Sequence, residues 1–169
     1  MTETWPIFDP GELLRRLTAA GVDFVVVGGI AAVLLGSPRM TRDLDVTYAP
    51  DPANLETLGR VLVALEARLR GAGGDVAFVP DARSIGQTEI LTLATRAGDL
   101  DLIRAPSGGS GYPRIRRRAE RVDIGGCSVL VASLDDLLAM KRAAGRPKDL
   151  ADVDELEAIR RLRRRGGRA

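Results

Sequence analysis

The chain has 169 residues, of which 45% are hydrophobic and 28% are charged, and its formal net charge is +2. This length and composition fit one globular domain that needs no disulfide or structural metal to fold. Histidine is absent and Cys127 is the only cysteine, which excludes disulfide frameworks, cysteine-rich zinc sites and Ser-His-Asp or Cys-His catalysis. Any catalysis must therefore rest on carboxylates, Lys, Arg, Tyr, Ser, Thr or a recruited metal.

No segment of the sequence reaches the ~20 consecutive apolar residues that a membrane-spanning helix requires. The first ten residues lack a basic stretch followed by a long apolar run, so they do not read as a signal peptide. We therefore expect a cytoplasmic protein with no membrane partner.

The first half of the chain is predicted to alternate between helices and strands. Asp-Pro pairs at 9–10 and 51–52 are typical of helix starts, where aspartate caps the first turn and proline takes the first helical position. A short β-branched apolar run is typical of a buried strand. In chain order, the expected elements are a helix over 10–20, a strand over 22–27, a short helix over 30–35, a strand over 43–48 and an amphipathic helix from 52 to about 70.

The second half is predicted to be richer in strands. A turn is expected at 71–74, and strands are expected at 76–79, 89–95, 100–103, 121–124 and 128–131. Ser133, with Asp136 three residues later, is typical of a capped helix start, and a last helix is expected from Pro147. This order predicts an α/β or α+β fold with the helices mostly on one side of a sheet. We expect one domain over 1–169, with a core over about 20–131, C-terminal helices over 133–165 and a basic tail over 166–169.

Three aspartates on two predicted strands form the most informative pattern. Asp43 and Asp45 are two residues apart, so their side chains share one strand face at roughly 7 Å spacing. Two such carboxylates repel each other unless a cation compensates, and oxygen ligands suit Mg²⁺. Asp101 can join them if its strand is a neighbour; Asp99 competes for this role, but we place it in the preceding turn. A solvent-facing acidic pair on an edge strand is the alternative.

Residues around these aspartates are candidates for binding phosphate. Gly28-Gly29 would let backbone N–H groups approach a ligand before a helix start, although taken alone the pair is better explained as a plain turn. Arg39 and Arg42 flank the carboxylates, with Thr41 between them, and could pair with phosphate oxygens. Surface charge explains Arg42 nearly as well.

Lysine is rare in this arginine-rich chain, which has it only at Lys141 and Lys148. A lysine kept in such a background suggests a compact point charge for phosphate, and Lys141 is the stronger candidate. Two arginine clusters, at 114–121 and 160–168, could contact phosphate, and the second would fit a role in binding RNA. An ordinary solvated surface explains each cluster equally well.

Taken in order, Gly28-Gly29, the run Arg39-x-Thr41-x-Asp43-x-Asp45 and a later aspartate resemble the nucleotidyltransferase superfamily of the DNA polymerase β type. Within it, the chain resembles small bacterial proteins related to AbiEii/AbiGii-type toxins (the MenT-like group) and to antibiotic nucleotidyltransferases. The segments 134–141 and 145–149 resemble the C-terminal signature of this group. The resemblance covers roughly residues 20–155, and many members have Gly-Ser where this chain has Gly28-Gly29.

The resemblance implies a polymerase β-type fold, with a mixed sheet flanked by helices and with C-terminal helices. It also implies transfer of a nucleoside monophosphate from an NTP, for example ATP, to a hydroxyl acceptor, with release of pyrophosphate. Asp43 and Asp45 would hold two Mg²⁺ ions, and Asp101 would ligate one of them and accept the acceptor's proton. The residues implied to bind the nucleotide are Gly28, Gly29, Arg39, Thr41, Arg42 and Lys141.

The sequence leaves the acceptor open. The likeness to AbiEii-type toxins suggests an RNA acceptor, such as tRNA, and a cognate antitoxin in a toxin–antitoxin system. A small hydroxylated compound such as an antibiotic would instead favour an acidic pocket, to which Glu89 or Asp99 could contribute. Modification of a partner protein and a non-catalytic domain that binds nucleotide or RNA are the remaining alternatives.

Overall fold

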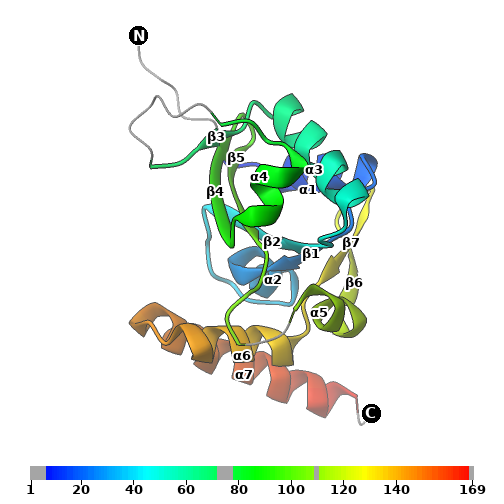
Figure 1. Cartoon of the computed structure of the whole chain (residues 1–169). Coiled ribbons are helices and arrows are strands. Elements are labelled where there is room, and N and C mark those ends of the chain that lie inside the picture. The colour runs from blue at the N-terminus through cyan, green and yellow to red at the C-terminus, as the bar shows by residue number, and fades with distance from the viewer. Residues whose placement is uncertain (1–6, 72–77, 109–110, 168–169) are drawn as a thin grey trace.

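A computed structural model describes residues 7–71, 78–108 and 111–167 (Figure 1). Its centre is a seven-stranded mixed sheet with the order β3-β4-β5-β2-β1-β7-β6. The pairs β1–β7 and β2–β5 are parallel, and the other neighbouring strands are antiparallel. The strands are β1 (Phe24–Val27), β2 (Asp43–Tyr48), β3 (Arg68–Leu69), β4 (Ile90–Thr95), β5 (Gly98–Ile103), β6 (Glu120–Asp123) and β7 (Ser128–Val131).

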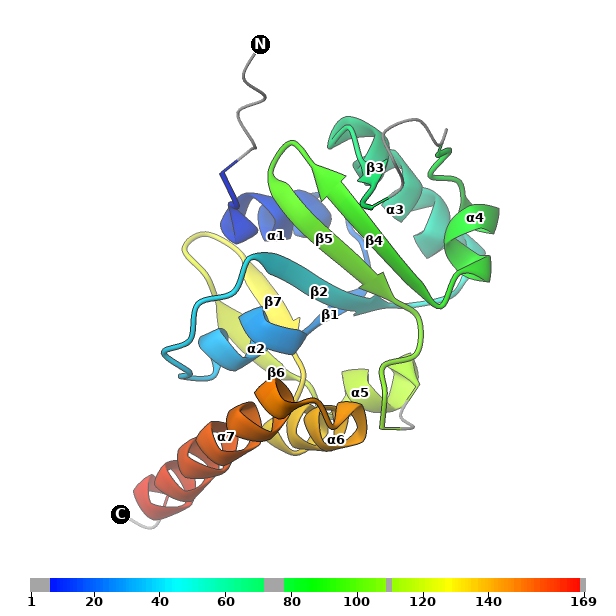
Figure 2. The ribbon, with the colours of Figure 1, turned by 90° about the vertical axis from the view of Figure 1, so that its left-hand side faces the viewer.

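Helices cover both faces of this sheet, so the expectation of helices mostly on one side is wrong. They are α1 (Pro10–Ala19), α2 (Gly28–Leu34), α3 (Pro52–Ala64), α4 (Ala82–Gln87), α5 (Tyr112–Arg118), α6 (Leu134–Ala144) and α7 (Pro147–Gly166). Helices α1, α3 and α4 lie on one side, whereas α2 lies on the other and the pair α6–α7 packs beyond it (Figures 1 and 2). In the part of the chain that the structure describes, no helix is both long and apolar enough to cross a membrane.

The two faces of the central strands differ in polarity. Leu44 and Val46 on β2, and Leu100 and Leu102 on β5, are fully buried in the core with α1 and α3. The residues between them on each strand point to the opposite face, because successive side chains alternate. That face carries the aspartates of both strands. The apolar alternation therefore fixes which side of the sheet presents carboxylates.

Several sequence-based boundaries need correction. The helix predicted to extend to about Arg70 ends at Ala64, because Glu66 takes a positive φ of 54° and the Ala67 amide bonds back to the Leu62 carbonyl. The chain then forms the short strand β3. The predicted strand over 76–79 lies partly outside the described residues, and residues 78–79 form no strand. Helices α4 and α5 were not predicted, since they have only six and seven residues and show little periodicity.

Candidate active site

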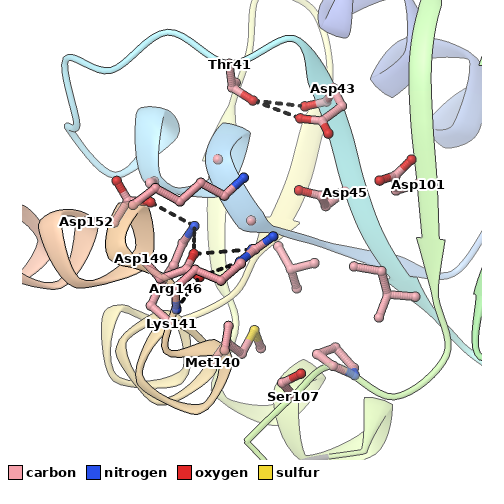
Figure 3. A pocket seen from close by; sticks show the side chains of 18 of the residues that line it. Thr41, Asp43, Asp45, Asp101, Ser107, Met140, Lys141, Arg146, Asp149 and Asp152 are labelled. Atoms are coloured by element: carbon pink, nitrogen blue, oxygen red, sulfur yellow. Dashed lines mark hydrogen bonds and ion pairs between the residues drawn. The ribbon is translucent and has the colours of Figure 1, made fainter. Parts of the chain in front are cut away.

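The parallel register of β2 and β5 brings the predicted aspartates together. Asp45 lies opposite Asp101, and Asp43 lies opposite Asp99. Asp99 is therefore part of β5 and not of the turn in which the sequence analysis placed it. Carboxylate oxygens of Asp43, Asp45 and Asp101 all lie within 4.8 Å of one another on the same face of the sheet (Figure 3). We call these three residues the sheet wall of the site.

The sheet wall has more negative charge than its surroundings neutralise. Burial raises the pKa of Asp45 to about 7, and the neighbouring charges of Asp43 and Asp101 add to the shift. Burial also raises the pKa of Asp101, against the opposing effect of the Arg70 guanidinium. Hard oxygen donors at close range, with a deficit of positive charge, are what a divalent cation such as Mg²⁺ fits. The three residues could therefore hold a divalent metal ion.

Gly28 and Gly29 lie directly beside the sheet wall, at the start of α2. Gly28 has a φ of +67°, and a Cβ atom there would lie 2.0 Å from Asp45 Oδ2. A Cβ atom at Gly29 would lie 2.8 Å from the Thr41 hydroxyl. The first of these positions requires glycine, because a side chain would collide with a carboxylate of the site. The glycine pair is therefore explained by close packing as well as by any approach of phosphate.

The loop before β2 orders one carboxylate of the sheet wall. The Thr41 hydroxyl donates to Asp43 Oδ1 at 3.0 Å. Arg39 forms an ion pair with Asp152 on α7 and lines the cleft described below. Arg42 is exposed and does not line that cleft, so its role as a phosphate ligand stays a prediction.

Opposite the sheet wall, the ends of α6 and α7 present paired charges. Lys141 Nζ lies 2.9 Å from Asp152 Oδ2 and 3.3 Å from Asp149 Oδ1. Arg146 Nε donates to Asp149 Oδ2 at 2.6 Å, and the Asp149 carboxylate is fully buried. We call Lys141, Arg146, Asp149 and Asp152 the helix wall. Figure 3 shows both walls facing a common space.

The space between the two walls is an open cleft of about 490 Å³. Gly28, Gly29, Arg39, Thr41 and Lys141 line it together with the three aspartates, and so does Lys148. The apolar part of its lining comes mainly from Ile90, Ile103, Ala105, Pro106, Met140 and Ala144. A cleft with carboxylates on one side and cations on the other suits a phosphorylated ligand that arrives with a divalent metal. All the sequence-predicted site residues except Arg42 thus meet at one place.

Arg70 was not singled out from the sequence, although it contacts the sheet wall. Its Nη2 atom lies 2.8 Å and 3.1 Å from the two oxygens of Asp101, and its Nη1 atom lies 2.7 Å from Asp99 Oδ2. The sequence pattern predicts a long helix that ends at about Arg70, far from β5. The strand β3, which turns Arg70 toward β5, has two residues and gave no recognisable strand pattern.

The two arginine clusters lie on neighbouring elements. Arg118 on α5 and Arg160 on α7 both pair with Asp135 at the start of α6, and Arg163 pairs with Glu120 on β6. Ion pairs therefore neutralise a part of each cluster. In the described part of the chain, no ion pair forms at five other arginines, namely Arg114, Arg117, Arg121, Arg164 and Arg165.

Comparisons with known proteins identify the family and the fold of the chain. A family model described as "Nucleotidyl transferase AbiEii toxin, Type IV TA system" matches residues 12–165. No curated protein sequence gives a significant match.

Solved structures of nucleotidyltransferases share the fold. The lincosamide antibiotic adenylyltransferase LnuA with bound lincomycin has a TM-score of 0.62 and 17% identity, covering 90% of this chain and 98% of that one. The enzyme ANT(2")-Ia in complex with adenylyl-2"-tobramycin has a TM-score of 0.52 and 16% identity, with coverages of 94% and 96%. A candidate nucleotidyltransferase from Thermotoga maritima has a TM-score of 0.50 and 17% identity, with coverages of 96% and 99%. The polymerase β-like fold is confirmed.

Proposed function

Since the chain belongs to the AbiEii nucleotidyltransferase family, we propose that it transfers a nucleoside monophosphate from an NTP to a hydroxyl group of RNA in a Mg²⁺-dependent reaction. Pyrophosphate is the leaving group, and tRNA is the acceptor we expect. The observation that carries the proposal is the cleft itself, with three clustered carboxylates on one wall and cations on the other. The carboxylates match the metal of a metal-bound triphosphate, and Arg39 and Lys141 match its phosphates once they exchange Asp152 for them.

The roles of the residues follow from their positions. Asp43, Asp45 and Asp101 would hold the metal, which when bound neutralises the triphosphate and lowers the pKa of the acceptor hydroxyl. Lys141 and Arg146 would donate to phosphate oxygens from the helix wall. With histidine absent from the chain, an oxygen of Asp101 is our candidate to accept the proton of the acceptor hydroxyl.

Binding of phosphate by the helix wall requires an exchange of partners. Lys141 is paired with Asp149 and Asp152, and Arg39 is paired with Asp152. A triphosphate offers these cations stronger, doubly charged acceptors than a single carboxylate. We propose that Arg39 and Lys141 turn from Asp152 to the phosphates, while the buried Asp149 keeps its contact with Arg146.

Charge in the cleft favours RNA over a cationic small molecule as the acceptor. Glu89, a candidate for an acidic pocket, is exposed and does not line the cleft, and Asp99 is paired with Arg70. Outside the sheet wall, Asp149 keeps its contact with Arg146 and Glu155 accepts from Ser37, so Asp152 is the one acid of the lining that would lose its partners when Arg39 and Lys141 turn to the phosphates. The arginines on α5 and α7 offer contacts to an RNA backbone.

A small hydroxylated acceptor is the second candidate function. It is favoured by the fold shared with LnuA and ANT(2")-Ia, whose structures contain lincomycin and adenylyl-2"-tobramycin. An uncharged or weakly charged compound would need no acidic pocket and could contact the apolar lining at Ile103 and Met140.

The family description also supports a role as the toxin of a toxin–antitoxin pair, with a cognate antitoxin as partner. We expect induced expression of the chain to arrest growth, and expression of the Asp45→Ala variant to leave growth unchanged. Equal arrest by both proteins at matched protein levels would contradict a toxic role that depends on transfer.

The decisive test supplies the purified protein with Mg²⁺ and each α-labelled NTP in turn. Total RNA, tRNA, a cell lysate and a set of hydroxylated antibiotics serve as acceptors, with Asp45→Ala as the control. We expect label on tRNA that the variant does not produce. Label on a small compound alone would favour the second candidate. Nucleotide or RNA binding without label or pyrophosphate under any condition would show a non-catalytic binding domain.

A further inference from the structure

Arg70 follows the edge strand β3 and contacts the Asp101 carboxylate of the sheet wall. Its backbone N–H donates to the Thr92 carbonyl at 3.0 Å, and Thr92 lies directly opposite Asp101 in the β4–β5 pair. Its guanidinium then reaches both oxygens of Asp101 through Nη2, at 2.8 Å and 3.1 Å. Arg70 is thus fixed to the same cross-strand pair at its backbone and at its side chain.

Asp99 holds the other side of the guanidinium. Its Oδ2 atom lies 2.7 Å from Arg70 Nη1. Asp99 and Asp101 are two residues apart on β5, so both point to the face on which Arg70 lies. Asp99 does not belong to the cluster of three carboxylates. Its contact with Arg70 therefore leaves the metal-binding oxygens of the site unchanged.

The pairing differs from an ordinary surface ion pair. The side chain of Asp101 is only 13% exposed, and that of Arg70 is 32% exposed. A planar guanidinium held at two nitrogens has a defined orientation, which it imposes on the carboxylate that it contacts. A flexible and fully solvated pair would impose no such orientation.

We propose that Arg70 is a positioning residue, which orients the Asp101 carboxylate for a divalent cation and is itself held in place by Asp99. The inference rests on the proposed function. A carboxylate offers about four lone-pair sites, and the guanidinium uses one on each oxygen, so further sites stay available to a metal. Partners that orient a metal ligand in this way typically change metal affinity about 10- to 100-fold when they are removed.

The experiment measures Mn²⁺ binding to the full chain without nucleotide, by the electron paramagnetic resonance signal of free Mn²⁺. The variants are Arg70→Gln, Arg70→Lys and Asp99→Asn, and the matched control is Arg68→Gln. Arg68 is exposed and lies in the same strand, and no ion pair forms there within the described residues. Thermal unfolding of each variant checks that the fold is intact.

We expect Arg70→Gln and Arg70→Lys both to weaken Mn²⁺ binding by about tenfold or more, because lysine keeps the charge but lacks the planar fork. Asp99→Asn is expected to cause a smaller loss, and Arg68→Gln none. Tighter binding by Arg70→Gln would overturn the proposal and identify Arg70 as a competitor of the metal. If Arg70→Lys binds Mn²⁺ as tightly as the wild type, the proposal is also overturned, because the positive charge at position 70 would then be sufficient.

Failure of this inference and failure of the proposed function give different results. Wild-type protein that binds Mn²⁺, together with an Arg70→Gln variant that binds it equally well, would reject the role of Arg70 alone. Wild-type protein that binds no Mn²⁺ without nucleotide would overturn this inference, whereas the proposed function would be rejected only by the absence of label transfer. If Arg70→Gln does not fold, Arg70→Lys and Asp99→Asn decide the question.

Discussion

The two walls of the cleft differ in how the negative charge of their aspartates is compensated. On the sheet wall, Asp43, Asp45 and Asp101 repel one another, and burial raises the pKa of Asp45 to about 7. On the helix wall, Asp149 is fully buried, yet its pKa is lowered, chiefly by the hydrogen bond from Arg146 and also by Lys141. The ionised carboxylates therefore destabilise the folded state on the sheet wall, whereas the ionised Asp149 stabilises it on the helix wall.

The difference fits the roles proposed for the two walls. Without a cation the carboxylates of the sheet wall destabilise the fold, which accords with the proposal that they bind a metal, whereas the buried Asp149 orients the cations proposed to bind phosphate. The helix wall is neutral within itself and orders the junction of α6 and α7 around Asp149. Substitutions on the two walls should therefore affect activity and stability in different proportions.

The largest expected effect is on activity, from Asp45→Asn on the sheet wall. We expect nucleotidyl transfer to fall by about 1,000-fold or more, because the metal supplies several kcal/mol of transition-state stabilisation. Initial rates with saturating NTP measure the effect. Asp123→Asn, on β6 and exposed, is the matched control and should keep wild-type activity. An Asp45→Asn variant that keeps a tenth of the wild-type rate would contradict the assignment of this wall.

The second effect is on stability, from Asp149→Asn on the helix wall. Loss of the buried charge leaves Arg146 without its partner and Lys141 with Asp152 alone, which we expect to lower the free energy of unfolding by about 2–3 kcal/mol. The melting temperature should fall by about 5–10 °C. Asp154→Asn, exposed on the same helix, is the control and should melt like the wild type. An unchanged melting temperature for Asp149→Asn would show that the helix wall does not depend on its buried acid.

The smallest expected effect is a pH dependence of the stability of the metal-free protein. Because the pKa of Asp45 is raised to about 7 in the folded state, the folded chain binds a proton more tightly than the unfolded chain. The stability from this proton is present at low pH and is lost as the pH rises through 7. Between pH 5.5 and pH 8 we expect a loss of roughly 1–2 kcal/mol. This corresponds to about 3–6 °C in melting temperature.

Two further measurements test the origin of this pH dependence. Asp45→Asn should remove most of the difference between the two pH values, and added Mg²⁺ should restore the melting temperature at pH 8. Asp149 does not oppose the trend in this range, since its lowered pKa places its own loss of stability at more acid pH. If the metal-free wild type melts at the same temperature at both pH values, the raised pKa of Asp45 is contradicted.

Much of the fold could be predicted from the sequence, because most elements have strong local signals. The buried β-branched run of β1, the alternation in β2 and the capped start of α6 are examples. The missed elements are short, and two of them, β3 and α4, depend on contacts with distant parts of the chain. The extended helix prediction failed because nothing in the local pattern marks the positive φ of Glu66.

The candidate site could be predicted from the sequence only in part. The spacing of Asp43 and Asp45 predicts a shared strand face, and that prediction needs no tertiary information. The pairing of Asp45 with Asp101 depends on a parallel register between strands that are far apart in sequence. Arg70 lies 31 residues before Asp101, in a segment whose pattern suggested a helix. Long-range pairing of this kind leaves no periodic signal in one sequence.

Gly29 and Thr41 have a consequence for the evolution of this site. A Cβ atom at position 29 would lie 2.8 Å from the Thr41 hydroxyl, which itself donates to Asp43. A relative with Gly-Ser at this point must therefore carry a smaller or differently turned side chain where this chain has Thr41. The two positions should therefore covary. A serine acquired at position 29 requires the Thr41 side chain to turn or to be replaced, whereas a smaller residue at position 41 meets no conflict with Gly29, so the change at position 41 is expected to come first.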